Sequence, residues 1–123
     1  MSTAVVTTLE DRESGESTPV LNAIYGSAKA WVNLANTTNP ISVRTSFNII
    51  GVVDMGVGVV KILFDTPMNT GAYSGIASAW NEGVTAAFSS APTSRTTTEC
   101  IFTVVNPSGS VTNASVLCIA IFD

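Results

Sequence analysis

From residue 28 to the end of the chain, short apolar runs alternate with clusters of Asn, Pro, Gly and Ser. The spacing between runs is about a dozen residues, which is typical of strands in a β-sandwich or barrel. The predicted strands are 28–34, 43–49, 59–64, 73–80, 84–88, 96–105 and 116–122. The pattern therefore predicts an all-β domain, an antiparallel β-sandwich or small barrel of about seven short strands.

The polar residues of the chain agree with this prediction. Only 11% of the residues are charged, against about 25% in typical soluble domains, whereas Ser, Thr and Asn make up roughly a third. Thr fits strands, and Ser and Asn fit turns. Lys and Glu usually cover the exposed face of a helix, and the whole chain contains only two Lys and five Glu. The run 116–122 is apolar on both faces, which predicts either a central strand or one that packs against another subunit.

Residues 1–24 differ from the domain at 25–123 and are predicted to form an extended N-terminal arm, with a disordered terminal tail as the alternative. Their middle is acidic, with about −3 of the net charge of −4, and apolar islands lie on either side of it. Such islands can dock on a partner while the charged stretch stays solvated. The arm residues expected to contact a partner are Val5, Val6, Leu9, Arg12, Val20 and Leu21.

Several classes of function are disfavoured. The chain has no histidine, which removes Ser-His-Asp and Cys-His catalysis and most zinc sites. Gly51, Gly56 and Gly58 do not match a phosphate-binding loop, and Asp54 and Asp65 are better explained as strand ends than as an acid–base pair. We therefore expect no enzyme activity, metal or cofactor. Without a basic patch or an apolar run of about 18 residues, we also expect no binding to nucleic acid or membrane.

The two cysteines leave two alternatives. Residues 1–9 lack the features of a signal peptide, so the chain is expected to be made in the cytoplasm with reduced thiols. Cys100 and Cys118 both lie in apolar runs, which favours buried small side chains over a disulfide between neighbouring strands.

The aromatic residues are compatible with a core or with a sugar-binding surface. Aromatic side chains at strand positions are more often core, and Trp31 is predicted to be buried, although it falls on the face opposite Ala30 and Val32. Tyr73 and Trp80 are the candidates for a receptor or glycan surface, since Trp80 lies beside a turn.

The segment 25–34, YGSAKAWVNL, resembles one found in phage tail-fibre and virion surface proteins. The resemblance continues through Arg44–Asn48, a hairpin at Asp54–Gly56, the turn Asn106–Gly109 and the closing strand Leu117–Phe122. It thus covers about residues 25–123 in order. The hairpin departs from the family pattern, because Met55 stands in place of Asn and apolar residues replace polar ones after it.

This resemblance implies a structural protein of the virion, assembled in the host cytoplasm and commonly trimeric. An arm followed by a small domain suits a capsid cement (decoration) protein that binds the major capsid protein through its arm and projects a β-knob. The alternative is a short tail-fibre or tail component that binds a host-surface receptor or glycan. Low charge and the apolar hairpin also favour a homotrimer. The residues expected at its subunit interface are Met55, Val57, Val59, Ile119, Ile121 and Phe122.

Overall fold

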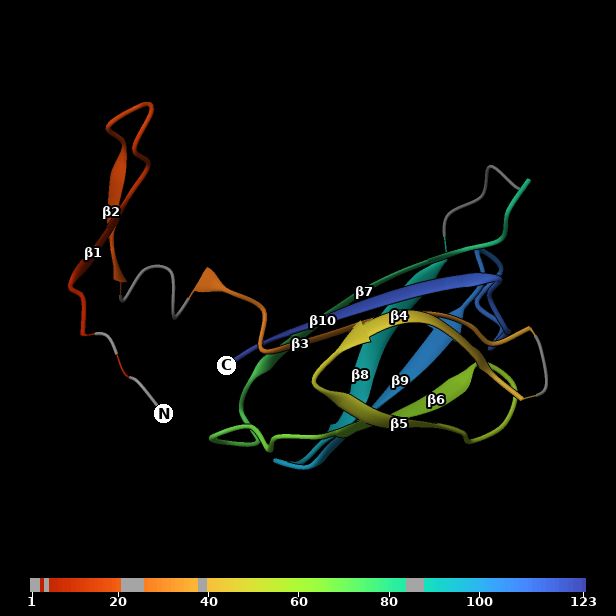
Figure 1. Cartoon of the computed structure of the whole chain (residues 1–123). Helices are drawn as coiled ribbons and strands as arrows, with labels where there is room; N and C mark the ends of the chain where they lie inside the picture. Colours follow the sequence, from red (N-terminus) through yellow and green to blue (C-terminus); the bar gives the residue numbers. More distant parts are fainter. Residues whose placement is uncertain (1–2, 4, 21–25, 38–39, 84–87) are drawn as a thin grey trace.

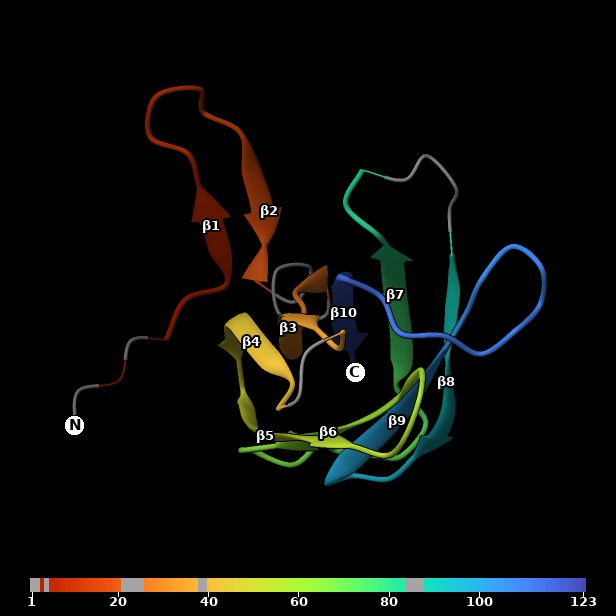
Figure 2. The same ribbon diagram turned by 90° about the vertical axis from the view of Figure 1, so that its right-hand side faces the viewer.

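The structure, a computed structural model, describes residues 3, 5–20, 26–37, 40–83 and 88–123. Over these residues ten strands pair antiparallel into a small hairpin and two four-stranded sheets. The two larger sheets pack face to face, and the hairpin stands apart from them (Figures 1 and 2). The predicted all-β class is confirmed, and the architecture is a β-sandwich.

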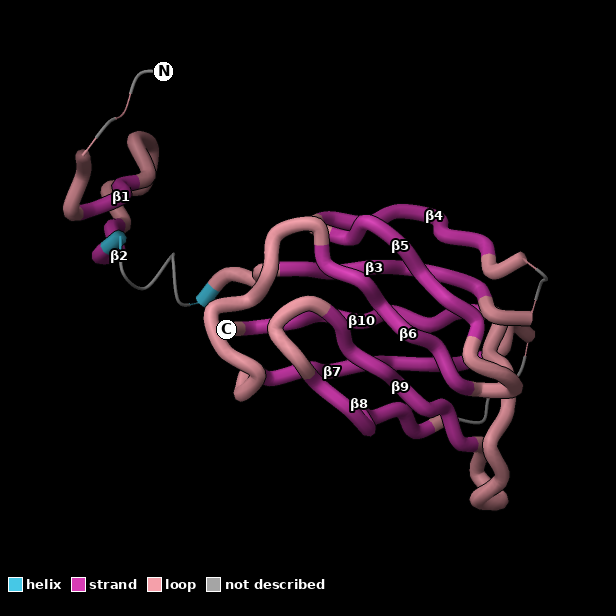
Figure 3. Tube along the Cα trace, turned by 90° about the horizontal axis from the view of Figure 1, so that it is seen from below, coloured by secondary structure: helices cyan, strands magenta, loops and turns pink. Residues whose placement is uncertain are grey.

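Each large sheet combines strands that are distant in sequence (Figure 3). In spatial order, sheet I contains β4 (Ser42–Phe47), β3 (Ala30–Ala35), β10 (Val116–Phe122) and β7 (Ser74–Trp80). Sheet II contains β5 (Ile49–Asp54), β6 (Val59–Phe64), β9 (Glu99–Val105) and β8 (Ser89–Arg95). The hairpin is formed by β1 (Thr8–Glu10) and β2 (Ser17–Pro19).

The core lies between the two sheets and follows the alternation of the strands. Every second side chain of β3, β6, β9 and β10 points inward, as the period of two in a strand requires. These inward side chains are Ala30, Val32 and Leu34; Val60, Ile62 and Phe64; Cys100, Phe102 and Val104; and Leu117, Ile119 and Ile121. β10 is the doubly apolar run, and it is a central strand that pairs with β3 on one side and β7 on the other.

The predicted strand 43–49 is in fact two strands in different sheets. The chain turns at Asn48, whose φ of 56° is left-handed, so that β4 ends in sheet I and β5 begins in sheet II. The Asn48 side chain holds this corner: its Nδ2 donates to the carbonyls of Lys29 (3.0 Å) and Thr66 (3.1 Å), and its Oδ1 accepts from the Thr66 N–H (2.6 Å). Asn tolerates this conformation better than most residues, which explains the corner locally.

β8 was missed by the sequence pattern, which predicts a loop at 89–94. This strand is rich in small polar residues and contains Pro92, whose missing N–H excludes it from central strands. β8 is an edge strand that pairs only with β9, so a proline is tolerated there. The strand predicted at 84–88 lies, except for Phe88, outside the described residues.

The N-terminal arm is not simply extended, because β1 and β2 form a hairpin within it. Asp11 organises the turn: its carboxylate accepts bonds from the Ser14 hydroxyl (2.6 Å) and the Glu13 N–H (3.0 Å), while Gly15 adopts a φ of 73°. The Ser14 bond, followed by that of Glu13, lowers the pKa of Asp11. An Asx-type turn of this kind closes a hairpin without any apolar alternation.

The predicted hairpin around Gly56 and Gly58 is confirmed between β5 and β6, and Gly58 is its most constrained residue. Its φ is 69°, and a Cβ there would lie 2.6 Å from the Thr112 carbonyl oxygen and 2.8 Å from the Thr112 nitrogen. Its own N–H donates to Asn113 Oδ1 at 2.7 Å, and its carbonyl accepts from the Val104 N–H at 2.8 Å. The backbone around Gly58 is thus fixed on both sides.

We therefore expect Gly58→Ala to lower the free energy of unfolding by more than about 2 kcal/mol, since conformational strain and a backbone clash add together. Gly109→Ala is the matched control, because Gly109 has a φ of 88° but open space where a Cβ would lie. It should cost only about 1 kcal/mol. Urea unfolding of both variants is the measurement, and equal losses would contradict the clash.

Candidate functional site

The outer face of sheet I, the face turned away from the core, carries an apolar row that crosses all four strands. Cross-strand pairing places Phe47 of β4 beside Trp31 of β3, Trp31 beside Ala120 of β10, and Ala120 beside Ile76 of β7. The three large side chains are 53%, 38% and 59% exposed for Phe47, Trp31 and Ile76, respectively. The Trp31 and Phe47 rings stack with their centroids 6.5 Å apart. We call these four residues the apolar row.

A second row, of small polar side chains, lies directly beside the apolar row. It consists of Thr45, Asn33, Cys118 and Ser78, again one from each strand of sheet I. All residues of the two rows except Phe47 line a shallow groove with a volume of about 500 Å³. No Asp, Glu, Lys or Arg lines this groove among the described residues, so it offers a neutral surface with hydroxyl, amide and thiol groups at its side.

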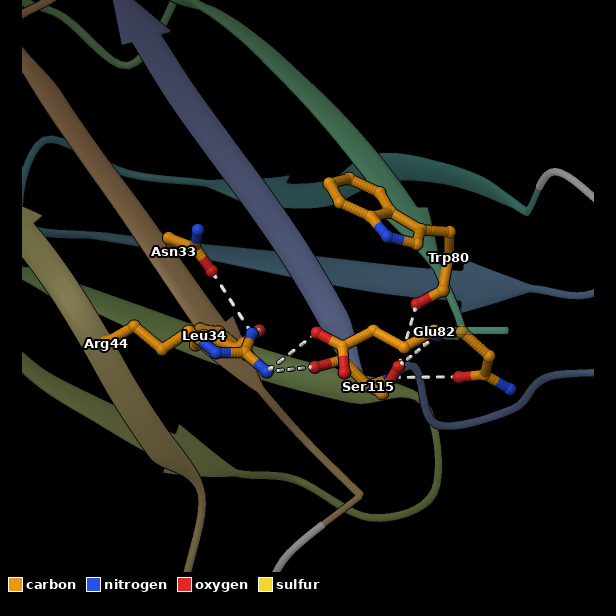
Figure 4. A network of polar contacts seen from close by, with 7 residues as sticks. Asn33, Leu34, Arg44, Trp80, Glu82 and Ser115 are labelled. Carbon is orange, nitrogen blue, oxygen red and sulfur yellow. Dashed lines mark hydrogen bonds and ion pairs between the residues drawn. The ribbon is translucent and has the colours of Figure 1, made fainter. Parts of the chain in front are cut away.

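At one end of this face, Arg44 forms hydrogen bonds that link three segments of the chain (Figure 4). Its guanidinium donates to Asn33 Oδ1 (3.3 Å) and to the carbonyls of Leu34 (3.4 Å) and Ser115 (2.9 Å). It also lies 3.9 Å from a Glu82 carboxylate oxygen, an exposed ion pair that contributes little by itself. The Glu82 N–H in turn bonds Ser115 Oγ at 2.8 Å. These bonds fix β4, β3 and the segment before β10, and they orient the Asn33 amide beside the groove.

The arm residues that were predicted to contact a partner lie outside the sandwich. Val5, Val6 and Leu9 are 92%, 53% and 48% exposed, and Arg12 is exposed in the hairpin turn. Val20 is half-buried, and Leu21 lies outside the described residues. Val5, Val6 and Leu9 are therefore available to another molecule.

Some of the residues predicted at a subunit interface are exposed, and others are buried in the core. Met55 and Val57 are exposed in the β5–β6 turn, and Val59 is half-buried. Ile119 and Ile121 are only 3% and 1% exposed because they point into the core, so the prediction that they contact a neighbour is wrong. Phe122 is half-buried at the end of β10, on the outer side of sheet I.

The predicted sugar-binding pair is also divided. Tyr73 is buried in the core and cannot present its ring to a ligand, so that part of the prediction is wrong. Trp80 is 38% exposed on β7. Trp31 was predicted to be buried and is equally exposed, because none of the described residues covers the outer face of sheet I at its position. In the sequence, Trp31 alternates with Ala30 and Val32, which indicates that it points away from the core. This alternation is the sequence feature that could have indicated the apolar row.

The two cysteines do not form a disulfide in this fold. Cys100 is buried in sheet II, and Cys118 is half-buried on the outer face of sheet I. Because the side chains belong to different layers, neither pairs with the other. Burial raises the pKa of the Cys100 thiol, which keeps it protonated and poorly reactive.

Within the described part of the chain, no group of three or more His, Cys, Asp or Glu residues could hold a metal ion. The same residues include no helix that is long and apolar enough to cross a membrane. Comparison with family models, curated proteins and solved structures finds no match for this chain. The candidate site is therefore described by its own geometry, that of a shallow groove without charged side chains among the described residues, bordered by hydroxyl, amide and thiol groups.

Proposed function

We propose that this protein is a non-enzymatic bacteriophage structural protein, a capsid decoration protein that assembles as a homotrimer. In this proposal residues 1–24 bind the major capsid protein, and the sandwich projects from the virion surface. The observation that carries it is the separation of the β1–β2 hairpin from the sandwich (Figure 1). Among the described residues the hairpin strands pair only with each other, and the flanking Val5 and Val6 are exposed.

The arm and the core are separate parts of the chain. All buried apolar side chains of the described residues lie at Ala30 or beyond, so the arm is not needed to fill the core. The arm carries exposed valines and an acidic turn but contributes no described side chain to the core of the sandwich. It is therefore suited to contact a neighbour. A partner surface with an apolar groove and a basic strip would fit it, and the attraction would weaken with salt.

The second candidate is a tail component that binds a neutral glycan on the host surface. It is favoured by the exposed rings of Trp31 and Trp80, which lie on the same sheet face as the hydroxyls of Thr45 and Ser78. Aromatic faces stack on sugar rings, and hydroxyl groups can bond sugar hydroxyls.

Imaging of virions labelled with an antibody against this protein distinguishes the two candidates. Label over the whole capsid shell supports the decoration protein, and label confined to the tail supports the tail component. Absence of label from purified virions, with the protein present in infected cells, would contradict both.

A further inference from the structure

The apolar row on sheet I is larger than an isolated surface hydrophobe and continuous across the sheet. Phe47, Trp31 and Ile76 are all more than a third exposed, with Ala120 between Trp31 and Ile76. Single exposed apolar residues are ordinary, but a contiguous row bordered by polar residues marks a contact surface. Thr45, Asn33 and Ser78 provide such a border on one side.

The outer face of sheet II differs from the two rows on sheet I in carrying charged side chains. There Lys61 and Glu99 point outward and form an ion pair at 3.6 Å. Charged side chains on an outward face discourage association with another sheet. The apolar row and the polar row beside it contain no charged side chain, and the nearest ion pair described, Arg44 with Glu82, lies at one end of the sheet.

The charge of the chain is also distributed in a way that permits copies to approach through their sandwiches. Four acidic side chains and Arg12, all within residues 10–16, account for −3 of the net charge of −4, which leaves −1 for the rest of the chain. Two nearly neutral faces meet without the repulsion that like charges would cause. A strongly basic or acidic partner would find no complementary charge in the groove.

The shape of the face suits a partner with the same row. The small Ala120 lies between the larger Trp31 and Ile76, so the groove of about 500 Å³ can receive a large side chain from a second copy. Four strands of six or seven residues make a flat face of roughly 20 by 20 Å, about 400 Å². This is about half of what one partner contributes to a standard interface, so the face supplies the centre of the contact and residues around the sheet would have to complete it.

We propose that the outer face of sheet I, centred on Trp31, Ala120 and Ile76, is the contact surface between copies of this chain. The proposal rests on the homotrimer of the proposed function and names the surface that forms it: three copies turn this face toward a common three-fold axis, because two copies of one face packed directly on each other would close as a dimer. It replaces the β5–β6 turn and the buried residues Ile119 and Ile121 as the subunit contact. Cys118, beside the row, would be covered in the oligomer.

The test compares three aspartate variants at exposed aliphatic residues of similar exposure. Ile76→Asp places a charge in the proposed contact, Ile50→Asp places one on edge strand β5 of sheet II, and Val57→Asp places one in the β5–β6 turn. The three residues are 59%, 69% and 64% exposed. Light scattering after size exclusion at micromolar concentration should show a trimer for the native protein, Ile50→Asp and Val57→Asp. The mass of Ile76→Asp should fall threefold to the 12.7 kDa of one chain, because a charge would be buried without a partner.

Circular dichroism melting establishes that Ile76→Asp remains folded, and Ile76→Ser replaces it if the aspartate variant does not fold. Cys118 provides a second measurement, since a thiol reagent should modify it faster in the dissociated variant than in the native protein. A trimer that persists in Ile76→Asp but dissociates in Val57→Asp would overturn the proposed surface and leave the homotrimer standing.

A native protein that is monomeric at micromolar concentration would overturn both the surface and the homotrimer. Native protein whose tryptophan fluorescence shifts on titration with neutral oligosaccharides, and whose trimer is unaffected by Ile76→Asp, would assign the face to a glycan instead. An Ile76-dependent trimer that is absent from capsids would contradict only the proposed function.

Discussion

Tyr73→Ala is expected to lower the free energy of unfolding by about 3–5 kcal/mol, the range for removing a large buried aromatic side chain. Tyr73 is 2% exposed, and its ring meets Phe64 edge to face with centroids 5.7 Å apart. The Arg95 guanidinium lies 5.9 Å from the centre of the same ring, and Arg95 Nη1 also donates to the Tyr73 carbonyl. The residue therefore joins the start of β7 to the end of β8 and to the core.

The hydroxyl of Tyr73 should account for a separate part of this loss. Its oxygen lies 2.9 Å from the Thr96 carbonyl oxygen and 3.0 Å from that of Glu99. The Glu99 carbonyl keeps a hydrogen bond from the Thr96 N–H at 2.9 Å. Removal of the hydroxyl therefore mainly leaves the Thr96 carbonyl without its bond from Tyr73. We expect Tyr73→Phe to cost about 1–3 kcal/mol, the penalty for an unsatisfied, partly buried group.

Urea unfolding at one fixed protein concentration measures these losses. Ile50→Ala is the control for a side chain on an outer face, since Ile50 is 69% exposed, and it should change the free energy by about 0.5 kcal/mol or less. A loss from Tyr73→Ala no larger than that of Ile50→Ala would show that the ring does not support the core.

Tyr73 should also make stability depend on alkaline pH. Burial raises the pKa of its phenol above the ordinary value of 10.0. In the unfolded chain the phenol loses its proton near pH 10, while in the folded chain it keeps it. The folded state thus binds more protons above pH 10, and its stability falls as pH rises. We expect the difference in unfolding free energy between native protein and Tyr73→Phe to narrow from pH 9 to pH 11; a constant difference would contradict this.

The parts of the fold that sequence predicts well are those in which one strand carries its own signal. β6 and β10 have the predicted bounds because β-branched and apolar residues fill them between clear turns. β8 lacks such a signal, since its edge position asks only for backbone pairing with β9 and tolerates Pro92. The break between β4 and β5 depends on one left-handed residue, Asn48, and on partners more than fifteen residues away, which no local pattern contains.

The candidate site was harder to predict for a related reason. The alternation of β3 places Trp31 opposite the core, but whether that side is covered depends on the layers of the whole sandwich. Phe47, Ala120 and Ile76 come from strands whose neighbours in space are set by the crossover order β4-β3-β10-β7. Sequence thus supplies the outward direction of each side chain, and only the topology brings the four together as a row.

Deletion of residues 1–22 is expected to abolish binding to the capsid while leaving the sandwich folded. In the part of the chain that the structure describes, β1 and β2 pair only with each other and no buried apolar residue precedes Ala30. The melting temperature and the trimer should therefore be retained. Loss of the trimer on truncation would instead place the arm within the contact between copies.

Complete loss of binding is expected because both groups that would contact the capsid lie in the deleted segment, where their contacts have to offset the cost of ordering it. Each residue fixed on binding costs about 1–2 kcal/mol of conformational entropy, and the paired β1 and β2 limit this cost to the residues around them. The exposed Val5 and Val6 then provide the apolar contact, and the acidic turn at residues 10–16 provides the electrostatic attraction. Neither group remains in the truncated chain.

Co-sedimentation of purified protein with capsids that lack it measures the effect. The double variant Val5→Asp, Val6→Asp should lose binding as the deletion does, because charges would enter an apolar contact. Glu13→Gln should still bind, because the apolar residues stay. Its binding should fall less with increasing salt than that of the native protein, since one charge of the turn is removed. Capsids decorated by the truncated protein would refute the role of the arm and move the capsid contact to the sandwich.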